Sequence, residues 1–402
     1  MIQTIEMPWL YDRHTHVSLY AALQGCPDLS GRAPEEALEL LRGLPRDRVT
    51  TVTGWHSSRL SFTPEQWAAL PPAILINFSL HGFALTAGCG RLLGPDALAL
   101  LEHQHDADWC ERNMERLLAF FGQSAGLTPA RLASFMAGLQ RAGIGAAEDM
   151  LLTDEAALRV IQASPWSALI RCWTTPAIYR TLGADAQAAV AGLKVFTDGA
   201  LGARTAAMAA PYTGGGYGML IHTGPELERL LAELQALGKP VAIHAIGGRA
   251  VAQALDALER LRADHLAFPW VRMEHVQFIS PADALRAKGL GVILSMQPNF
   301  NSDSEDYSDR LGPAERAANN PFRMLLDQAG FRCGEDLILG SDGMPHGVEY
   351  ALQWSLFPAC PGQRLTADEL VEGFGLAPGS RGHTLLTVDE ERRKVRLVAS
   401  EA

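Results

Sequence analysis

The sequence predicts an α/β fold, a (β/α)8 or TIM barrel, and three observations support this. In the second half of the chain, short apolar runs alternate with segments of helical period, which is the order of a parallel sheet covered by helices. Eight apolar runs can be found along the chain, and eight strands close a barrel. Polar residues follow several runs directly, where a barrel would gather them at one mouth.

The expected strands are short and rich in apolar residues. They cover residues 8–13, 144–148, 168–173, 192–197, 240–244, 270–274, 290–297 and 336–340. Helices are expected between the later strands, at residues 225–237, 248–262, 281–288 and 320–329.

Residues 17–142 then form a large insertion after the first strand. Within it we expect strands at 48–54 and 73–78, and helices at 106–122 and 129–142. After the barrel, Thr366 and Glu369 have the spacing of a capping box that starts a helix, and residues 393–400 are expected to form a last strand. We therefore treat residues 1–402 as one domain that contains the insertion.

Composition excludes several classes of protein. The 402 residues are 48% hydrophobic and carry a formal net charge of −11, which argues against nucleic acid and anionic membranes as partners. No apolar run approaches the ~18 residues of a membrane span. The N-terminal residues lack the apolar segment of a signal peptide, so the expected location is the cytoplasm. None of the six cysteines has C-x-x-C spacing, so no zinc ribbon or redox motif is expected.

The first chemical signal is Asp12-Arg13-His14-Thr15-His16, at the end of the first expected strand. Two histidines at positions i and i+2 of an extended strand point to the same side. Both imidazoles could therefore reach one metal ion. Taken alone, the pair is explained equally well as a polar strand end.

Further candidates follow other strands. His244, His275 and Asp342 each lie at the C-terminal end of an expected strand, and Lys194 lies within one. A single histidine in such a place is usually a hydrogen-bonded core residue. Several polar groups in one barrel mouth without a partner would cost several kcal/mol, so their combination predicts a metal site.

At this point the sequence resembles the amidohydrolase superfamily of metal-dependent hydrolases, and within it the YtcJ-like branch that includes N-substituted formamide deformylase. The motifs that carry the resemblance are Asp-Arg-His-Thr-His (12–16), Lys-Val-Phe-Thr-Asp-Gly-Ala-Leu-Gly-Ala-Arg-Thr-Ala (194–206), His-Ala-Ile-Gly-Gly-Arg-Ala (244–250), Arg-Met-Glu-His-Val-Gln (272–277), Ser-Met-Gln-Pro (295–298) and Gly-Ser-Asp-Gly-Met-Pro (340–345). They span residues 12 to about 375, and Ser-Leu-His-Gly (79–82) in the insertion also fits this branch.

The resemblance implies one or two divalent metals, usually zinc. The implied ligands are His14, His16, Lys194, His244, His275 and Asp342. In many members the lysine is carboxylated by CO2, and the resulting anionic carbamate bridges two metals. The alternative for Lys194 is a free amine paired with a carboxylate beside a single metal.

The resemblance also implies a small β-sandwich built from both chain ends beside the barrel. Only about eleven residues precede the first motif. We therefore expect this sandwich to be reduced or absent, with its N-terminal half missing.

The function implied is hydrolysis of a C–N bond in a small molecule, such as an amide, N-acyl or N-formyl group. The candidate catalytic residues are Asp342, His275 and His81. Asp342 would move the proton from water to the leaving amine. An esterase or lactonase, an isomerase using the same metals, and an inactive binding protein remain alternatives. A homodimer is compatible with the sequence.

Each of the lesser candidates also has a purely structural explanation. Glu148 or Asp149 could orient a metal ligand from behind. Arg204 could bind a substrate carboxylate or form a structural salt bridge. The aromatic residues that could line an apolar pocket or belong to the core are Trp55, Trp173 and Tyr179.

Overall fold

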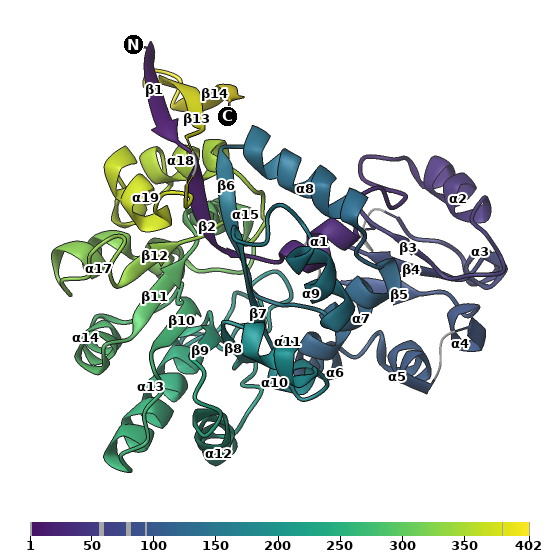
Figure 1. The fold of residues 1–402 in the computed structure, drawn as a ribbon, viewed down its shortest axis with the longest axis horizontal. Coiled ribbons are helices and arrows are strands. Elements are labelled where there is room, and N and C mark those ends of the chain that lie inside the picture. Colours follow the sequence, from purple (N-terminus) through teal and green to yellow (C-terminus); the bar gives the residue numbers. More distant parts are fainter. Residues whose placement is uncertain (1, 56–59, 78–81, 93–94, 380, 402) are drawn as a thin grey trace.

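The centre of the molecule is an eight-stranded sheet in which every hydrogen-bonded pair is parallel (Figure 1). The computed structural model describes residues 2–401 except 56–59, 78–81, 93–94 and 380. In sheet order the strands are β12 (Leu337–Leu339), β11 (Ile293–Met296), β10 (Val271–His275), β9 (Val241–Ala245), β8 (Gly192–Phe196), β7 (Ile170–Thr174), β6 (Ile144–Asp149) and β2 (Leu10–Thr15). The sequence prediction of the barrel is thereby confirmed.

The barrel closes where its first strand meets its last. The Asp342 N–H donates to the carbonyl of His14 at 2.7 Å. The Asp12 carboxylate accepts hydrogen bonds from the N–H of Ser341 at 2.9 Å and from its hydroxyl. Gly340 permits this approach, because a Cβ there would lie 2.4 Å from the His14 nitrogen. The closing contacts therefore involve the motif of the first strand itself.

Helices cover the outside of the barrel (Figure 1). They are α9 (Glu155–Gln162), α10 (Pro176–Tyr179), α11 (Ala184–Ala189), α12 (Gly224–Gln235), α13 (Gly248–Ala263), α14 (Pro281–Leu290), α15 (Asp303–Asp306), α16 (Pro313–Ala318), α17 (Phe322–Asp327), α18 (Val348–Leu356) and α19 (Ala367–Phe374). The longer helices bury one stripe each; α13, for example, buries Val251, Leu255 and Leu258 at helical spacing. The capping box of α19 is present, with Thr366 and Glu369 bonded to each other's backbone.

The insertion lies beside the barrel, on the right in Figure 1. It has its own sheet, in which β4 (Ala73–Ile76) pairs parallel with β3 (Thr50–Val52) and antiparallel with β5 (Phe83–Leu85). Its helices are α1 (Val17–Ala22), α2 (Pro34–Arg42), α3 (Pro64–Ala69), α4 (Cys89–Leu92), α5 (Pro95–His103), α6 (Ala107–Arg112), α7 (Met114–Ala125) and α8 (Pro129–Arg141). The single helix expected at 106–122 is thus two helices that meet at Asn113.

A small antiparallel sheet flanks the barrel at the two chain ends (Figure 1). Its strand order is β1 (Ile2–Pro8), β13 (His383–Asp389) and β14 (Lys394–Glu401). The flanking structure is therefore reduced, as expected, but the expectation that the N-terminal part is missing was wrong. Most of the side chains of β1 are exposed, so its sequence carries little of the apolar alternation that indicates a strand.

Two negative observations hold for the described part of the chain. None of its helices is both long and apolar enough to cross a bilayer. All six cysteines are free thiols, in agreement with their scattered spacing.

Barrel closure at Gly340 can be tested by adding one methyl group. Gly340→Ala should lower the free energy of unfolding by about 1–3 kcal/mol, because the added Cβ must displace the His14 backbone. Gly289→Ala is the control: a Cβ at this helical position meets nothing within 4 Å, and the change should stabilise by up to about 1 kcal/mol. Urea unfolding followed by circular dichroism measures both. Equal effects of the two changes would contradict a tight closing contact.

Candidate metal centre

Three side chains converge at the mouth of the barrel. His14 and His275 lie at the ends of β2 and β10, and Asp342 follows β12. Each offers one possible ligand atom, and these atoms lie within 4.8 Å of one another. His275 and Asp342 have φ angles of +70° and +56°, a backbone region that residues other than glycine rarely adopt. Such strain is common at functional sites, where the surroundings hold it in place.

In two of the imidazoles, the Nδ1 atom is hydrogen-bonded to an acceptor. Nδ1 of His14 lies 2.6 Å from Oε2 of Glu274, and Nδ1 of His275 lies 2.8 Å from Oε1 of Gln297. Each acceptor fixes the ring proton on Nδ1 and leaves the Nε2 lone pair available. This arrangement is typical of metal-binding histidines, so the described donors fit a divalent cation.

His16 and His14 both face the carboxylate of Asp342. Their Nε2 atoms lie 3.0 Å and 3.6 Å from the same oxygen, Oδ1. Burial by itself raises the pKa of Asp342, but His14 and His16 more than offset this and lower it below its ordinary value. Asp342 is therefore ionised at neutral pH. The Nδ1 atom of His16 is buried and has no partner among the described residues.

Lys194 is buried inside the barrel on β8. Burial lowers the pKa of its amine to about 8, although the charges of Glu274 and Asp342 act in the opposite direction. Within the described residues, no carboxylate oxygen lies within 4.0 Å of its Nζ atom, which is 5.5 Å from the centre of the Phe196 ring. A substantial fraction of this amine is therefore neutral at slightly alkaline pH.

His244 lies next to the converging group but points elsewhere. Its ring centre is 4.6 Å from that of His275. Its Nε2 atom, however, is 3.2 Å from the carbonyl of Gly199 and 3.5 Å from Oδ1 of Asp198. Asp198 is itself fixed by three backbone N–H groups. A metal-binding role for His244 therefore stays a prediction.

A buried arginine that sequence reasoning did not single out lies behind these residues. Arg272 donates to Glu274 at 2.6 Å and to Glu148 at 2.7 Å, and all three side chains are almost completely buried. Its Nη2 atom also donates to the carbonyl of Arg13 and to Ser295. Arg272 thus holds Glu274, the acceptor that orients His14. The signals in the sequence were the motif at 272–277, which contains both Arg272 and Glu274, and strand alternation, which places these two side chains on the same face.

Most of the lesser candidates have structural roles. Glu148 binds Arg272 and the indole N–H of Trp173, rather than a candidate ligand. Asp149 accepts a hydrogen bond from the N–H of Ser18. Arg204 donates to the carbonyl of Thr213 and lies 3.7 Å from Asp309. Trp173 and Tyr179 belong to the core. His81, the third candidate catalytic residue, lies outside the described residues.

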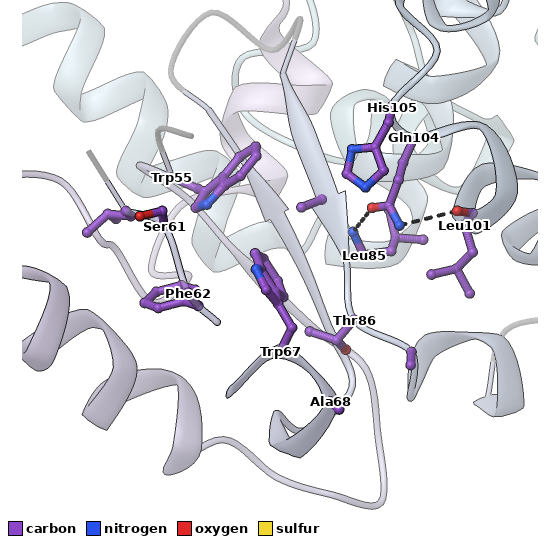
Figure 2. A pocket seen from close by; sticks show the side chains of 13 residues that line it. Trp55, Ser61, Phe62, Trp67, Ala68, Leu85, Thr86, Leu101, Gln104 and His105 are labelled. Atoms are coloured by element: carbon purple, nitrogen blue, oxygen red, sulfur yellow. Dashed lines mark hydrogen bonds between the residues drawn. The ribbon is translucent and has the colours of Figure 1, made fainter. Parts of the chain in front are cut away.

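Trp55 lines a hollow in the insertion, shown in Figure 2. The ring of Trp67 is edge-on to that of Trp55, with ring centres 6.5 Å apart, and Phe62 packs against Trp67. Gln104, on the opposite wall, accepts a hydrogen bond from the Leu85 N–H and donates to the Leu101 carbonyl. The hollow measures about 530 Å³, and its lining includes no candidate metal ligand.

A smaller hollow of about 70 Å³ is lined by two residues of the candidate metal centre, His275 and Asp342. His244, His275 and Asp342 are among the residues that line it. The other lining residues come from the segments that follow β8, β9, β10, β11 and β12; they are Ala200, Leu201, Gly202, Ile246, Gln277, Phe300, Asp303, Tyr307 and Met344. A substrate that reaches the converging ligands must contact these segments.

Comparison with known proteins agrees with this geometry. A sequence profile described as "Amidohydrolase family" matches residues 7–349. YtcJ of Bacillus subtilis (strain 168), whose name assigns it to the amidohydrolases, is 35% identical over 144 residues, or 35% of this chain and 27% of YtcJ. The match spans about a quarter of the length of the curated relatives.

Two solved structures share the fold. An uncharacterized metal-dependent hydrolase from Pyrococcus horikoshii OT3 superposes with a TM-score of 0.64 at 24% identity, covering 88% of this chain and 74% of that one. Another from Pyrococcus furiosus has a TM-score of 0.66 at 22% identity and covers 92% and 81%. At these identities the comparison establishes the architecture alone.

The buried position of Arg272 predicts a large effect of its removal. Arg272→Met should lower the free energy of unfolding by about 3–5 kcal/mol, because Glu148 and Glu274 would remain buried without their cation. Arg286→Met is the control, since Arg286 binds three carboxylates at the surface, and its loss should cost about 1 kcal/mol or less. Urea unfolding at pH 7 measures both variants. A similar decrease in the free energy of unfolding in both variants would show that burial does not determine how much the Arg272 ion pairs stabilise the fold.

Proposed function

The chain belongs to the amidohydrolase family, and from that premise we propose that it is a metal-dependent hydrolase of a non-peptide C–N bond. The bond belongs to an amide, N-acyl or N-formyl group of a small molecule. The observation that carries the proposal is the convergence of His14, His275 and Asp342, whose ligand atoms lie within 4.8 Å of one another. Three groups from three separate strand ends meet there, and two of the imidazoles are already oriented by acceptors.

We assign one or two divalent metals to this mouth, with zinc favoured by the nitrogen and oxygen donors. The proposed ligands are His14, His16, Lys194, His244, His275 and Asp342. A metal in such a site lowers the pKa of water and polarises a carbonyl group. Lys194 would participate as its carbamate, because an ammonium group cannot bind a cation. Its burial and its lowered pKa of about 8 favour the neutral amine that reacts with CO2.

Asp342 is the residue that moves the proton. Its pKa lies below the ordinary value, so it is a carboxylate when water attacks the substrate carbonyl. In the hydrolysis a C–O bond forms and the C–N bond breaks. Asp342 takes the proton from the attacking water and transfers it to the leaving nitrogen, which departs as a neutral amine. His275, at the end of β10, is proposed to bind the metal beside the reacting bond. His81 is proposed to contact the substrate.

Removal of the Asp342 carboxylate should separate catalysis from folding. With N-pentylformamide as substrate, Asp342→Asn should lower kcat by about 10²- to 10⁴-fold, because the side-chain amide cannot take up and release the proton that the carboxylate is proposed to transfer. Asp256→Asn, a change on the exposed outer face of α13, is the control and should be unaffected. The protein's metal content is measured on the same samples by elemental analysis. Activity that persists after complete metal removal by a chelator would sink the proposal.

Lys194 carboxylation should depend on pH in a defined direction. Only the neutral amine reacts with CO2, and its fraction rises with pH until the pKa of about 8 is passed. At constant dissolved CO2, reactivation of metal-free protein by zinc should therefore quicken about eight-fold between pH 6.5 and 7.5 and level off above about pH 9. Lys194→Met should not respond to CO2. If the rate of reactivation of the unaltered protein does not depend on CO2, the result would indicate a free lysine beside a single metal.

A further inference from the structure

A second polar cluster shares the 70 Å³ hollow with the metal centre and takes no part in the proposed proton transfer. It consists of Asp303, Gln277 and Tyr307. Asp303 and Tyr307 lie at the two ends of the short helix α15, after β11, and Gln277 follows His275 by two positions. The cluster therefore faces whatever part of a substrate extends beyond the reacting bond.

Asp303 is a carboxylate with few partners. Its Oδ2 atom accepts a hydrogen bond from Nε2 of Gln277 at 2.8 Å. In the described structure no donor is found for Oδ1, and no lysine, arginine or histidine nitrogen lies within 4.0 Å of either oxygen. Burial raises the pKa of Asp303 to about 7, partly offset by Gln277. The nearby cation, Arg310, is bonded instead to Asp309 and to the carbonyl of Gly202.

Gln277 adds a second acceptor to the same wall. Its Nε2 atom donates to Asp303 and, at 3.0 Å, to Oδ1 of Asn319, which uses both amide hydrogens. The polar atom that remains is the side-chain carbonyl oxygen. This side of the hollow therefore offers an ionisable carboxyl group and a carbonyl oxygen, and a cationic hydrogen-bond donor complements both.

The remaining walls are apolar or aromatic. The Phe300 ring stacks on His275, with centres 5.8 Å apart and planes inclined by 17°. Leu201, Ile246 and Met344 complete this surface. Beside such a surface, and with Asp303 itself only partly exposed, an ion pair is stronger than at a fully exposed position.

We propose that Asp303 is a specificity-determining residue that binds a protonated amine on the substrate. The substrate class is then a small N-acyl or N-formyl amine that carries a second, cationic amino group a few bonds from the C–N bond. Gln277 positions the Asp303 carboxylate. This inference rests on the proposed hydrolase function and specifies its substrate.

The test compares two substrates that differ in one group. N-formyl-1,4-diaminobutane ends in an ammonium group, whereas N-pentylformamide has a methyl group in that place; homologues with two to five methylenes scan the distance. With zinc-loaded protein, the best cationic substrate should exceed its neutral match at least ten-fold in kcat/KM. Asp303→Asn should abolish that preference, with a roughly ten- to hundred-fold rise in KM for the cation and less than two-fold change for the neutral substrate.

Asp306→Asn is the matched control. It removes the same charge from the same short helix, but from an exposed side chain, and should keep the preference. Asp303→Asn retains an oxygen that can accept from Gln277, so folding should survive. Lack of cation preference in the unaltered protein, or its retention in Asp303→Asn, would overturn the inference while leaving the hydrolase function intact.

If neither substrate is hydrolysed, the proposed function fails. The role of Asp303 is then tested separately, by measuring the binding of a diamine. Calorimetry with 1,4-diaminobutane and zinc-loaded protein then gives the readout. Binding that weakens at least ten-fold in Asp303→Asn, and not in Asp306→Asn, would support the subsite. Equal binding by all three proteins would reject it.

Discussion

The contact between the first and last barrel strands is the constraint on which the candidate site depends. The Asp342 N–H reaches the carbonyl of His14, and Asp12 is hydrogen-bonded to Ser341. The same few residues therefore close the sheet and supply two of the three converging side chains. Any shift of register at this seam would move His14 and Asp342 apart, so the stability of the barrel and the geometry of the centre cannot vary independently.

Charge balance inside the barrel is the second condition. Arg272 forms ion pairs with Glu148 and Glu274, Arg13 lies 3.7 Å from Glu148, and Glu274 in turn fixes the ring of His14. Lys194 has no such direct partner among the described residues, and burial lowers its pKa. The interior thus holds one cation, Arg272, that is paired with carboxylates. It also holds a second, Lys194, whose charged form is destabilised by burial. The first serves the structure, whereas the second is the group whose chemistry a metal or CO2 could change.

The sequence predicted the barrel well because buried parallel strands are continuous apolar runs, and eight of them could be counted. It placed His14, His275 and Asp342 at one mouth because strand ends meet there. It could not predict that His244 turns toward Gly199, since strand position determines where a residue lies and not its side-chain rotamer. It missed Glu274 as the partner of His14, because neighbours along a strand normally face opposite sides. The backbone of His275 has a positive φ, however, and so departs from the extended conformation in which neighbouring side chains alternate. The break at Asn113 and the strand Ile2–Pro8 had no strong local signal.

The two ends of the small hollow are held by different parts of the molecule. The metal end stands on barrel strands and on the Arg272 network, so its geometry is fixed by the core. The opposite end is formed by segments after β8 and β11, which Arg310 joins through the carbonyl groups of Leu201 and Gly202. Tyr307 packs beneath Arg310 and approaches Gly202 where a side chain would crowd it. Changes in these segments can therefore alter what the hollow accepts without disturbing the strand ends that carry His14, His275 and Asp342. A carboxylate at position 303 lies on this adjustable side, where a choice among substrates would be made.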